Sequence, residues 1–548
     1  MKNSLLKSPL LWIFLGALVI RLVGIDWGLP NNIRAFSLHP DEQVNLIYAR
    51  QIEPFKFKFT PGFYNYGTLY LTLLRIVSDV VGTYAGGFDQ AGNLTPFGMG
   101  QVHLAGRFLN CLFGAGLACV TYLMAARFLK PIAAVFAGIL VAVAPALVVH
   151  SRFQTVDMLA ALLATASVYF SLKLIDEKAD FVNTVVIAGT LAGLSAGTKY
   201  VGIVALFPLV PVLVKRGNSE SFKGFGIALV ACLLAFLVAT PGALLEREVF
   251  IHDFMFEVNH SKTGHGIVFA GTSPAVLYHI GNLSLGFSII CTLLGVVGLV
   301  LSVAKRQLVG TVLLTFGLLY FAAVSGGQIK FMRYVLPLIP VLAIGTGMML
   351  ERLEELRGTR WAIIAGMLLV GGFDRGALNG TAVFTAAMKA PDARDSAGLW
   401  LKQQGAKSVG IATDPWFWSA TLQPEMPVSR MIGRRRLVEL WKQWENPKVV
   451  RIVTEEVDET PEWDPRILSI GKPDYFVFTS LEYAAVDRLA QQKSNPEYQQ
   501  LVDRYNSFIQ ELGANYTAVW QNEADHVAVV EDMEYVRPRV VIWKRKSL

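Results

Sequence analysis

The chain has 548 residues, of which 53% are hydrophobic and only 17% are charged. Soluble globular proteins usually carry about 25% charged residues, so the long apolar runs exclude an ordinary soluble protein and indicate a polytopic membrane protein. The formal net charge is +7. Lys and Arg at cytoplasmic helix ends produce such an excess by themselves, so nucleic acid is not expected as a partner.

Apolar runs near the length of a membrane span follow one another along most of the chain, and about eleven spans are expected. They lie at about 9–29, 103–126, 131–149, 156–175, 183–198, 200–214, 222–241, 280–303, 307–325, 334–350 and 361–376. The first follows Lys2 and Lys7 like a signal peptide, but it has no small-residue cleavage site and is interpreted as a span. All four cysteines fall inside apolar runs and indicate neither a disulfide framework nor a zinc site.

The short loops on one side of these spans are all basic, which by the positive-inside rule makes that side cytoplasmic. Their basic residues are Lys2, Lys7, Arg127, Lys130, Lys173, Lys178, Lys215, Arg216, Lys223, Lys305, Arg306, Arg352, Arg357 and Arg360. The longer segments 30–102 and 242–279 then face the outer side. The protein is expected to be an integral, multi-pass protein of a bacterial inner or plasma membrane, with its site on the periplasmic or extracellular face.

The last part of the chain differs in character from the rest. After Asp392 the charge density rises and the apolar runs shorten. KSVGIAT, DYFVFTS and RVVIWKR have the pattern of strands, and LWLKQQ and NSFIQELG that of helices. We therefore predict a polytopic α-helical membrane domain over 1–385 and a soluble, extracytoplasmic α/β domain over 386–548. Eleven spans place this domain outside, whereas an even number would place it in the cytoplasm.

Ionisable residues collect at helix ends on the predicted outer face, where their cost in an apolar phase makes them informative. They are Asp41, Glu42, Arg107, Arg152, Asp157, Lys199, Lys330 and Arg333. Each alone is compatible with an interfacial anchor, and Asp41 with Glu42 also fits the start of a helix. Together they fit an outer-facing cavity of mixed charge, with acids to activate a nucleophile and bases to hold an anion.

Histidines are the candidate metal ligands. His260 and His265 lie in HDFMFEVNHSKTGHG, and His39 precedes the acidic pair. No pair has the i, i+4 spacing on a clear helix, so ordinary loop histidines are favoured. No cofactor is certain, and a requirement for a divalent metal ion is left open.

Several motifs in order resemble a known family. LHPDEQ holds the acidic pair, and it is followed by FYNYGTLYLTLLR, APALVVHSRFQTVD, GLSAGTKYVGIVALFPL and FMRYVLPLIPVLAIG. This layout resembles the GT-C glycosyltransferases. It is most similar to glycosyltransferase family 39, with the protein O-mannosyltransferases and the lipid A aminoarabinose transferases.

The resemblance implies an inverting hexosyl- or pentosyltransferase of the cell envelope with a polyprenyl-phosphate-sugar donor and a glycan, lipid or protein acceptor. Asp41 matches the expected general base and Asp157 the second acid, which positions the acceptor or a metal ion. The residues predicted to be catalytic are Asp41, Glu42 and Asp157, and those predicted to bind the donor phosphate are Lys199, Arg333, Tyr66 and Arg107. One departure is TPGFYNYG, which stands where the family often carries Lys-Pro or His-Pro-Pro; Tyr64, Asn65 and Tyr66 are the candidates there for a phosphate contact.

Two alternatives remain at this stage. A transporter or lipid flippase would use the same polar residues to line a pathway, although no internal repeat is evident and the charges cluster at one surface. A scaffold of the same fold without activity would use the C-terminal domain as a binding module.

Overall fold

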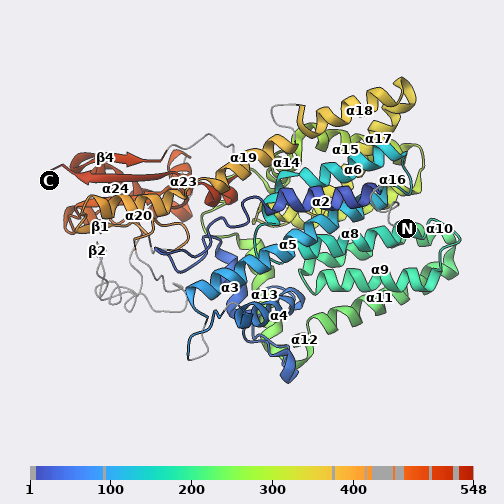
Figure 1. The fold of residues 1–548 in the computed structure, drawn as a ribbon, viewed down its shortest axis with the longest axis horizontal. Coiled ribbons are helices and arrows are strands. Elements are labelled where there is room, and N and C mark those ends of the chain that lie inside the picture. Colours follow the sequence, from blue (N-terminus) through green and yellow to red (C-terminus); the bar gives the residue numbers. More distant parts are fainter. Residues whose placement is uncertain are drawn as a thin grey trace.

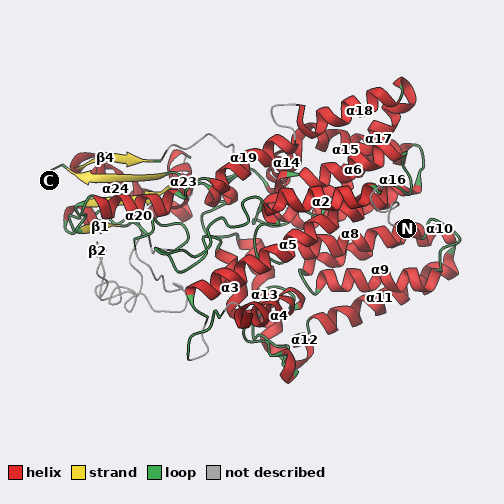
Figure 2. Ribbon diagram, in the orientation of Figure 1, coloured by secondary structure: helices red, strands yellow, loops and turns green. Residues whose placement is uncertain are grey.

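The computed structural model describes residues 8–84, 86–90, 94–372, 377–413, 416–422, 448–450, 462–492, 496–522 and 530–546. A bundle of helices forms one half of the molecule, and the C-terminal part of the chain forms the other (Figure 1). The strands lie together at the C-terminal end (Figure 2).

The bundle is built from helices that run along one another. They are α2 (Pro9–Leu22), α5 (Pro96–Ala125), α6 (Pro131–Val143), α7 (Pro145–His150), α8 (Asp157–Lys173), α9 (Phe181–Ala196), α10 (Leu209–Arg216), α11 (Asn218–Ala239), α14 (Ala275–Leu283), α15 (Ile289–Ala304), α16 (Leu308–Ser325), α17 (Leu338–Arg357) and α18 (Thr359–Met367). Prolines at the first helical position open α2, α5, α6 and α7, where the missing N–H costs nothing. Short π-helical turns, η3 (Ser284–Ser288) and η5 (Leu368–Gly372), follow α14 and α18.

Small residues let the closest helix pairs touch. Between α9 and α11, a Cβ on Gly193 would lie 2.1 Å from the Cys232 carbonyl oxygen. Between α15 and α17, a Cβ on Gly298 would lie 2.0 Å from the Gly345 carbonyl oxygen. Such small-residue contacts are typical of helices packed in a membrane.

By length and composition, 4 helices in the described part of the chain can cross a membrane. They are Phe97–Ala125, Ser221–Ala239, Ala275–Ala304 and Leu308–Ser325, and shorter apolar helices accompany them at Pro9–Leu22, Pro131–Val143, Phe181–Ala196 and Thr359–Gly371. Two expected spans are broken. Pro145 separates α6 from α7, and the run at 200–214 is a 3-10 helix, η2 (Tyr200–Leu206), followed by α10. Proline lacks an N–H and clashes with the preceding turn, and the two breaks fall at Pro145 and at Pro208, which directly precedes α10 (Leu209–Arg216).

A second group of elements covers the end of the bundle that faces the C-terminal part (Figure 1). It consists of α3 (Pro40–Ala49), η1 (Pro54–Lys56), α4 (Leu69–Tyr84), α12 (Gly242–Leu245), α13 (Arg247–Thr263) and η4 (Met332–Val335). These elements come from the segments expected to face the outer side. The basic turns gather at the other end, where Lys215, Lys305 and Arg352 line one cavity.

The C-terminal part forms a mixed sheet with the strand order β2-β1-β3-β5-β4. The preceding helix, α19 (Ala377–Lys389), packs into the core of the bundle. The elements of the C-terminal part are α20 (Ala393–Gln403), β1 (Ser408–Gly410), β2 (Lys448–Val450), α22 (Arg466–Ser469), β3 (Tyr475–Thr479), α23 (Ser480–Gln491), η6 (Pro496–Tyr498), α24 (Gln499–Asn515), β4 (Tyr516–Gln521), η7 (Glu531–Val536) and β5 (Val540–Arg545). β1 pairs in parallel with β2 and β3, whereas β5 is antiparallel to β3 and β4.

Alternate residues of β3 build two separate cores. Tyr475 and Val477 pack with Leu401 of α20 on one face, and Phe476 packs with Phe508 of α24 on the other. β1, β3 and β5 lie within the segments predicted as strands. α24 contains NSFIQELG, and α20 contains all of LWLKQQ except its last residue, Gln404. The domain boundary at 385/386 and the placement of this domain on the outer face stay predictions.

Asp532 makes the stability of this part depend on pH. Its carboxylate accepts a hydrogen bond from the Met332 N–H at 2.8 Å, and burial raises its pKa from 3.8 to about 7. The folded chain therefore holds this proton more tightly than the unfolded chain. The stabilisation is complete below the unfolded pKa and is lost as the pH rises through about 7, an effect of at most about 4 kcal/mol.

Asp532→Asn keeps an acceptor for the Met332 N–H but cannot ionise. We expect the difference in Tm between this variant and the wild type to be more positive at pH 8 than at pH 5. Scanning fluorimetry of both proteins in one detergent measures this difference. An equal difference at the two pH values would contradict the assignment.

Candidate active site

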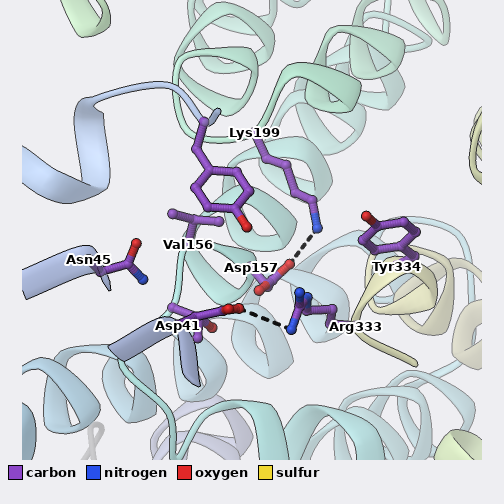
Figure 3. Close-up of a pocket in the computed structure, with 9 residues that line it drawn as sticks. Asp41, Asn45, Val156, Asp157, Lys199, Arg333 and Tyr334 are labelled. Carbon is purple, nitrogen blue, oxygen red and sulfur yellow. Dashed lines mark hydrogen bonds and ion pairs between the residues drawn. The ribbon is translucent and has the colours of Figure 1, made fainter. Parts of the chain in front are cut away.

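A pocket lies where α3, the N-terminal ends of α8 and η2, and η4 meet at the covered end of the bundle (Figure 3). Its lining residues are Asp41, Asn45, Tyr66, Thr155, Val156, Asp157, Lys199, Arg333 and Tyr334. The fold therefore brings together Asp41, Asp157, Lys199, Arg333 and Tyr66, which are far apart in the sequence and were predicted as site residues.

Asp41 stands in the first turn of α3, where the helix dipole favours a carboxylate. Pro40 begins the helix, and the His39 Nδ1 atom accepts a hydrogen bond from the Asp41 N–H at 3.3 Å. The carboxylate lies 3.0 Å from the Arg333 Nη1 atom and remains 25% exposed. It is thus both held in place and open to the pocket.

Asp157 and Lys199 form the second ion pair. The Lys199 Nζ atom lies 2.6 Å from the carboxylate of Asp157, the first residue of α8. The same ammonium lies 4.3 Å from the centroid of the Tyr334 ring, a cation–π contact that fixes its direction. Figure 3 shows the two ion pairs side by side.

The cations of the pocket keep donors available for a ligand. An ammonium has three N–H donors and a guanidinium five, and each ion pair described above uses only part of them. Arg333 is further fixed by the Phe331 ring, whose centroid is 4.0 Å from its Cζ atom. The arrangement can hold an anion at Arg333 and Lys199 while a carboxylate accepts a proton beside it.

Glu42 and Arg107 do not line the pocket. Both side chains are fully buried, and the guanidinium binds the carboxylate through its Nε and Nη2 atoms at 2.7 Å each. The Gln154 N–H also donates to Glu42, at 2.8 Å. Burial alone would raise the pKa of Glu42, but the Arg107 guanidinium lowers it to about 2. The geometry therefore gives no support to the predicted catalytic role of Glu42 or to the predicted phosphate contact of Arg107. The ion pair between them instead joins α3 to α5.

Of the three candidates in TPGFYNYG, Tyr66 lines the pocket. Tyr64 and Asn65 face α12 and α13 instead. The Tyr64 hydroxyl donates to Glu246 at 2.6 Å, and the Asn65 amide donates to Glu257 at 2.6 Å. These two contacts anchor the loop that presents Tyr66.

Two of the three candidate metal ligands lie next to each other. The His260 Nε2 and His265 Nδ1 atoms are 3.0 Å apart, whereas His39 caps α3. Across the described ranges, no group of three or more His, Cys, Asp or Glu side chains is placed to hold a metal ion. The metal requirement therefore stays open, and the chemistry below is derived from the protein's own side chains.

Four pocket residues were missed from the sequence, namely Asn45, Thr155, Val156 and Tyr334. Asn45 follows Asp41 by one helical turn, so the helical period could have placed the two on one face. Tyr334 adjoins Arg333, and Thr155 precedes Asp157 by two residues. Neither of these last two carries a signal of its own in the sequence.

Known proteins share this architecture. A family model for dolichyl-phosphate-mannose-protein mannosyltransferases matches residues 97–244, which include Asp157 and Lys199. Among curated proteins, none matches the sequence.

Three solved structures illustrate the similarity. Archaeal oligosaccharyltransferase AglB from Archaeoglobus fulgidus, in complex with an inhibitory peptide and a dolichol-phosphate, is 12% identical, with 98% of this chain and 88% of that chain covered and a TM-score of 0.52. ArnT from Cupriavidus metallidurans, bound to undecaprenyl phosphate, is 18% identical, with 72% of each chain covered and a TM-score of 0.48. The Archaeoglobus fulgidus oligosaccharyltransferase with zinc and sulfate is 16% identical, with a TM-score of 0.48 over 72% of this chain, which spans only 55% of that one.

The match to AglB extends over almost the whole chain and shows a common fold. The family model covers the helices that carry one acid and one base of the pocket. Residues 97–244 are therefore similar to the mannosyltransferase family, and the chain as a whole shares the fold of the archaeal oligosaccharyltransferase.

Proposed function

We propose that this protein is an inverting glycosyltransferase that moves a sugar from a polyprenyl-phosphate-linked donor to an acceptor at the outer face of the membrane. One observation carries the proposal: separate stretches of the chain place two carboxylates and two cations around one pocket at the end of the bundle. The basic turns at the opposite end support the sidedness, because such turns are typical of the cytoplasmic face.

The chemistry is a single displacement at the anomeric carbon of the sugar. An acceptor hydroxyl or amine forms a bond to that carbon, the bond to the phosphate oxygen breaks, and the electron pair leaves with the polyprenyl phosphate. Asp41 accepts the proton of the acceptor, and a base in that position contributes typically 10²–10⁴-fold. One displacement inverts the configuration of the anomeric carbon.

Arg333 and Lys199 stabilise the phosphate as it departs. Charge-assisted hydrogen bonds from guanidinium and ammonium groups strengthen as negative charge builds on the leaving oxygen. Arg333 touches the Asp41 carboxylate as well, so one side chain links the base to the leaving group. The lipid chain stays in the bilayer while its headgroup enters the pocket.

Release of polyprenyl phosphate by the purified protein tests the proposal. The protein is reconstituted in nanodiscs with a panel of polyprenyl-phosphate sugars, and the free polyprenyl phosphate is counted by mass spectrometry. We expect release that depends on an added acceptor. Movement of intact donor across a liposome membrane without release would instead identify a flippase.

Lys199→Gln removes one of the two phosphate-binding cations and leaves a neutral partner for Asp157. We expect kcat/KM for the donor to fall roughly 10- to 100-fold, because a hydrogen bond to a charged group contributes about 1.5–3 kcal/mol. Initial rates over a range of donor concentrations measure this loss. Lys223→Gln, at the basic end of the bundle, is the control and should retain the wild-type value; an unchanged kcat/KM in Lys199→Gln would remove this residue from the donor site.

A further inference from the structure

The short helix η7 of the C-terminal part contacts the residues directly before Arg333 and just before Asp41. Asp532, Met533, Tyr535 and Val536 are all buried, and the last three pack into the same hydrophobic core as the bundle helices. A surface connection would be exposed, so η7 is an inserted element and not a linker.

One side of η7 contacts η4, the 3-10 helix that carries Arg333. The Asp532 carboxylate accepts a hydrogen bond from the Met332 N–H at 2.8 Å, directly before Arg333. The neighbouring Glu531 is fixed in turn, because it accepts a hydrogen bond from the Tyr278 hydroxyl and pairs with Arg488 at 3.5 Å. The position of η4 relative to the pocket therefore depends on η7.

The other side of η7 holds the residue that caps Asp41. The ring centroid of Tyr535 lies 5.3 Å from that of His39 and 5.7 Å from that of Phe153. His39 is buried between these rings, and its Nδ1 atom accepts from the Asp41 N–H. The Tyr535 backbone is itself fixed, since its carbonyl accepts a hydrogen bond from Arg394 at 2.8 Å.

The same short helix thus contacts a close neighbour of each member of the Asp41–Arg333 ion pair, namely His39 and Met332. We propose that η7 sets the geometry of this pair and that Asp532 and Tyr535 are positioning residues for sugar transfer, which makes the C-terminal domain part of the catalytic unit. This inference rests on the proposed function. A misplacement of about 1 Å in a reacting group can reduce a rate 10²-fold, so the support has a measurable effect.

The two residues act through different partners and should change different kinetic constants. Tyr535→Ala removes the ring beside His39 and loosens the base, so kcat should fall roughly 10- to 100-fold at unchanged donor KM. Asp532→Leu removes the acceptor of the Met332 N–H and loosens Arg333, so the donor KM should rise. Tyr535→Phe keeps the ring and Asp532→Asn keeps the acceptor, and both should stay near wild type.

The experiment uses the full chain in nanodiscs and expresses turnover per competent site, counted by stoichiometric titration with polyprenyl phosphate. Tyr505→Ala is the matched control, because this buried ring packs on Trp463 in a separate hydrophobic core of the same domain, whereas the buried apolar residues of η7 belong to the core of the bundle. It should lower Tm and leave turnover per competent site unchanged. Equal turnover per site in Tyr535→Ala and Tyr505→Ala, or no rescue by Tyr535→Phe, would overturn the positioning role while the wild type remains active. A wild type that releases no polyprenyl phosphate would overturn the proposed function and this inference with it.

Discussion

Asp41→Asn is expected to reduce sugar transfer by about 10²–10⁴-fold, because the amide cannot accept the proton of the acceptor. The variant should fold, since the amide oxygen still accepts from Arg333 and the Asp41 backbone N–H still meets His39. Release of polyprenyl phosphate at saturating donor and acceptor measures the loss. Binding of polyprenyl phosphate should persist, because the cations proposed to hold the phosphate are intact.

Asp26→Asn is the matched control for this experiment. Asp26 is also paired with a cation, Lys389 at 3.4 Å, but its side chain is 62% exposed and lies outside the pocket. Its variant should transfer sugar at the wild-type rate. A rate for Asp41→Asn that stays close to wild type would remove Asp41 as the base, and Asp157 would then be the remaining carboxylate of the pocket.

The acids and bases of the pocket could be predicted from the sequence because each interrupts or borders an apolar run. Asp157, for example, lies in the first turn of a span that contains no other acid. The strands of the C-terminal domain were equally visible, because β-branched and aromatic residues in Tyr475–Thr479 stand between turn residues. These signals are local, so tertiary structure did not have to be known.

The difference between Asp41 and Glu42 could not be predicted. Adjacent residues on a helix point about 100° apart, so one of the pair faces the pocket and the other faces α5. Which one does so depends on Arg107, which is 65 residues away from Glu42. The contact between Met332 and Asp532 spans 200 residues and leaves no trace in a local pattern. The breaks at Pro145 and Pro208, by contrast, were marked in the sequence by the prolines themselves.

Arg107→Met is expected to destabilise the protein by about 3–5 kcal/mol, because it leaves the Glu42 carboxylate buried without its cation. Arg107 also donates to the carbonyl groups of Ile25 and Trp27, at 2.7 and 2.6 Å, and these acceptors would lose their donor. The expected drop in Tm is about 3–4 °C, because the shift per kcal/mol is small in a chain of this length. Scanning fluorimetry and the yield of monodisperse protein measure the effect.

Two further variants separate the buried charge from a general effect of losing an arginine. Arg75→Met breaks an ion pair that remains partly exposed, with Arg75 at 20% and Asp79 at 33%, and should cost less than the loss of the buried pair. Adding Glu42→Gln to Arg107→Met removes the uncompensated charge while an amide oxygen still accepts from the Gln154 N–H, so the double variant should be more stable than Arg107→Met alone. If the double variant were the less stable of the two, Glu42 would not depend on Arg107 for its charge. Glu42 adjoins Asp41 on α3. Recovery of stability without recovery of transfer would therefore indicate that the Glu42–Arg107 pair also positions the proposed base.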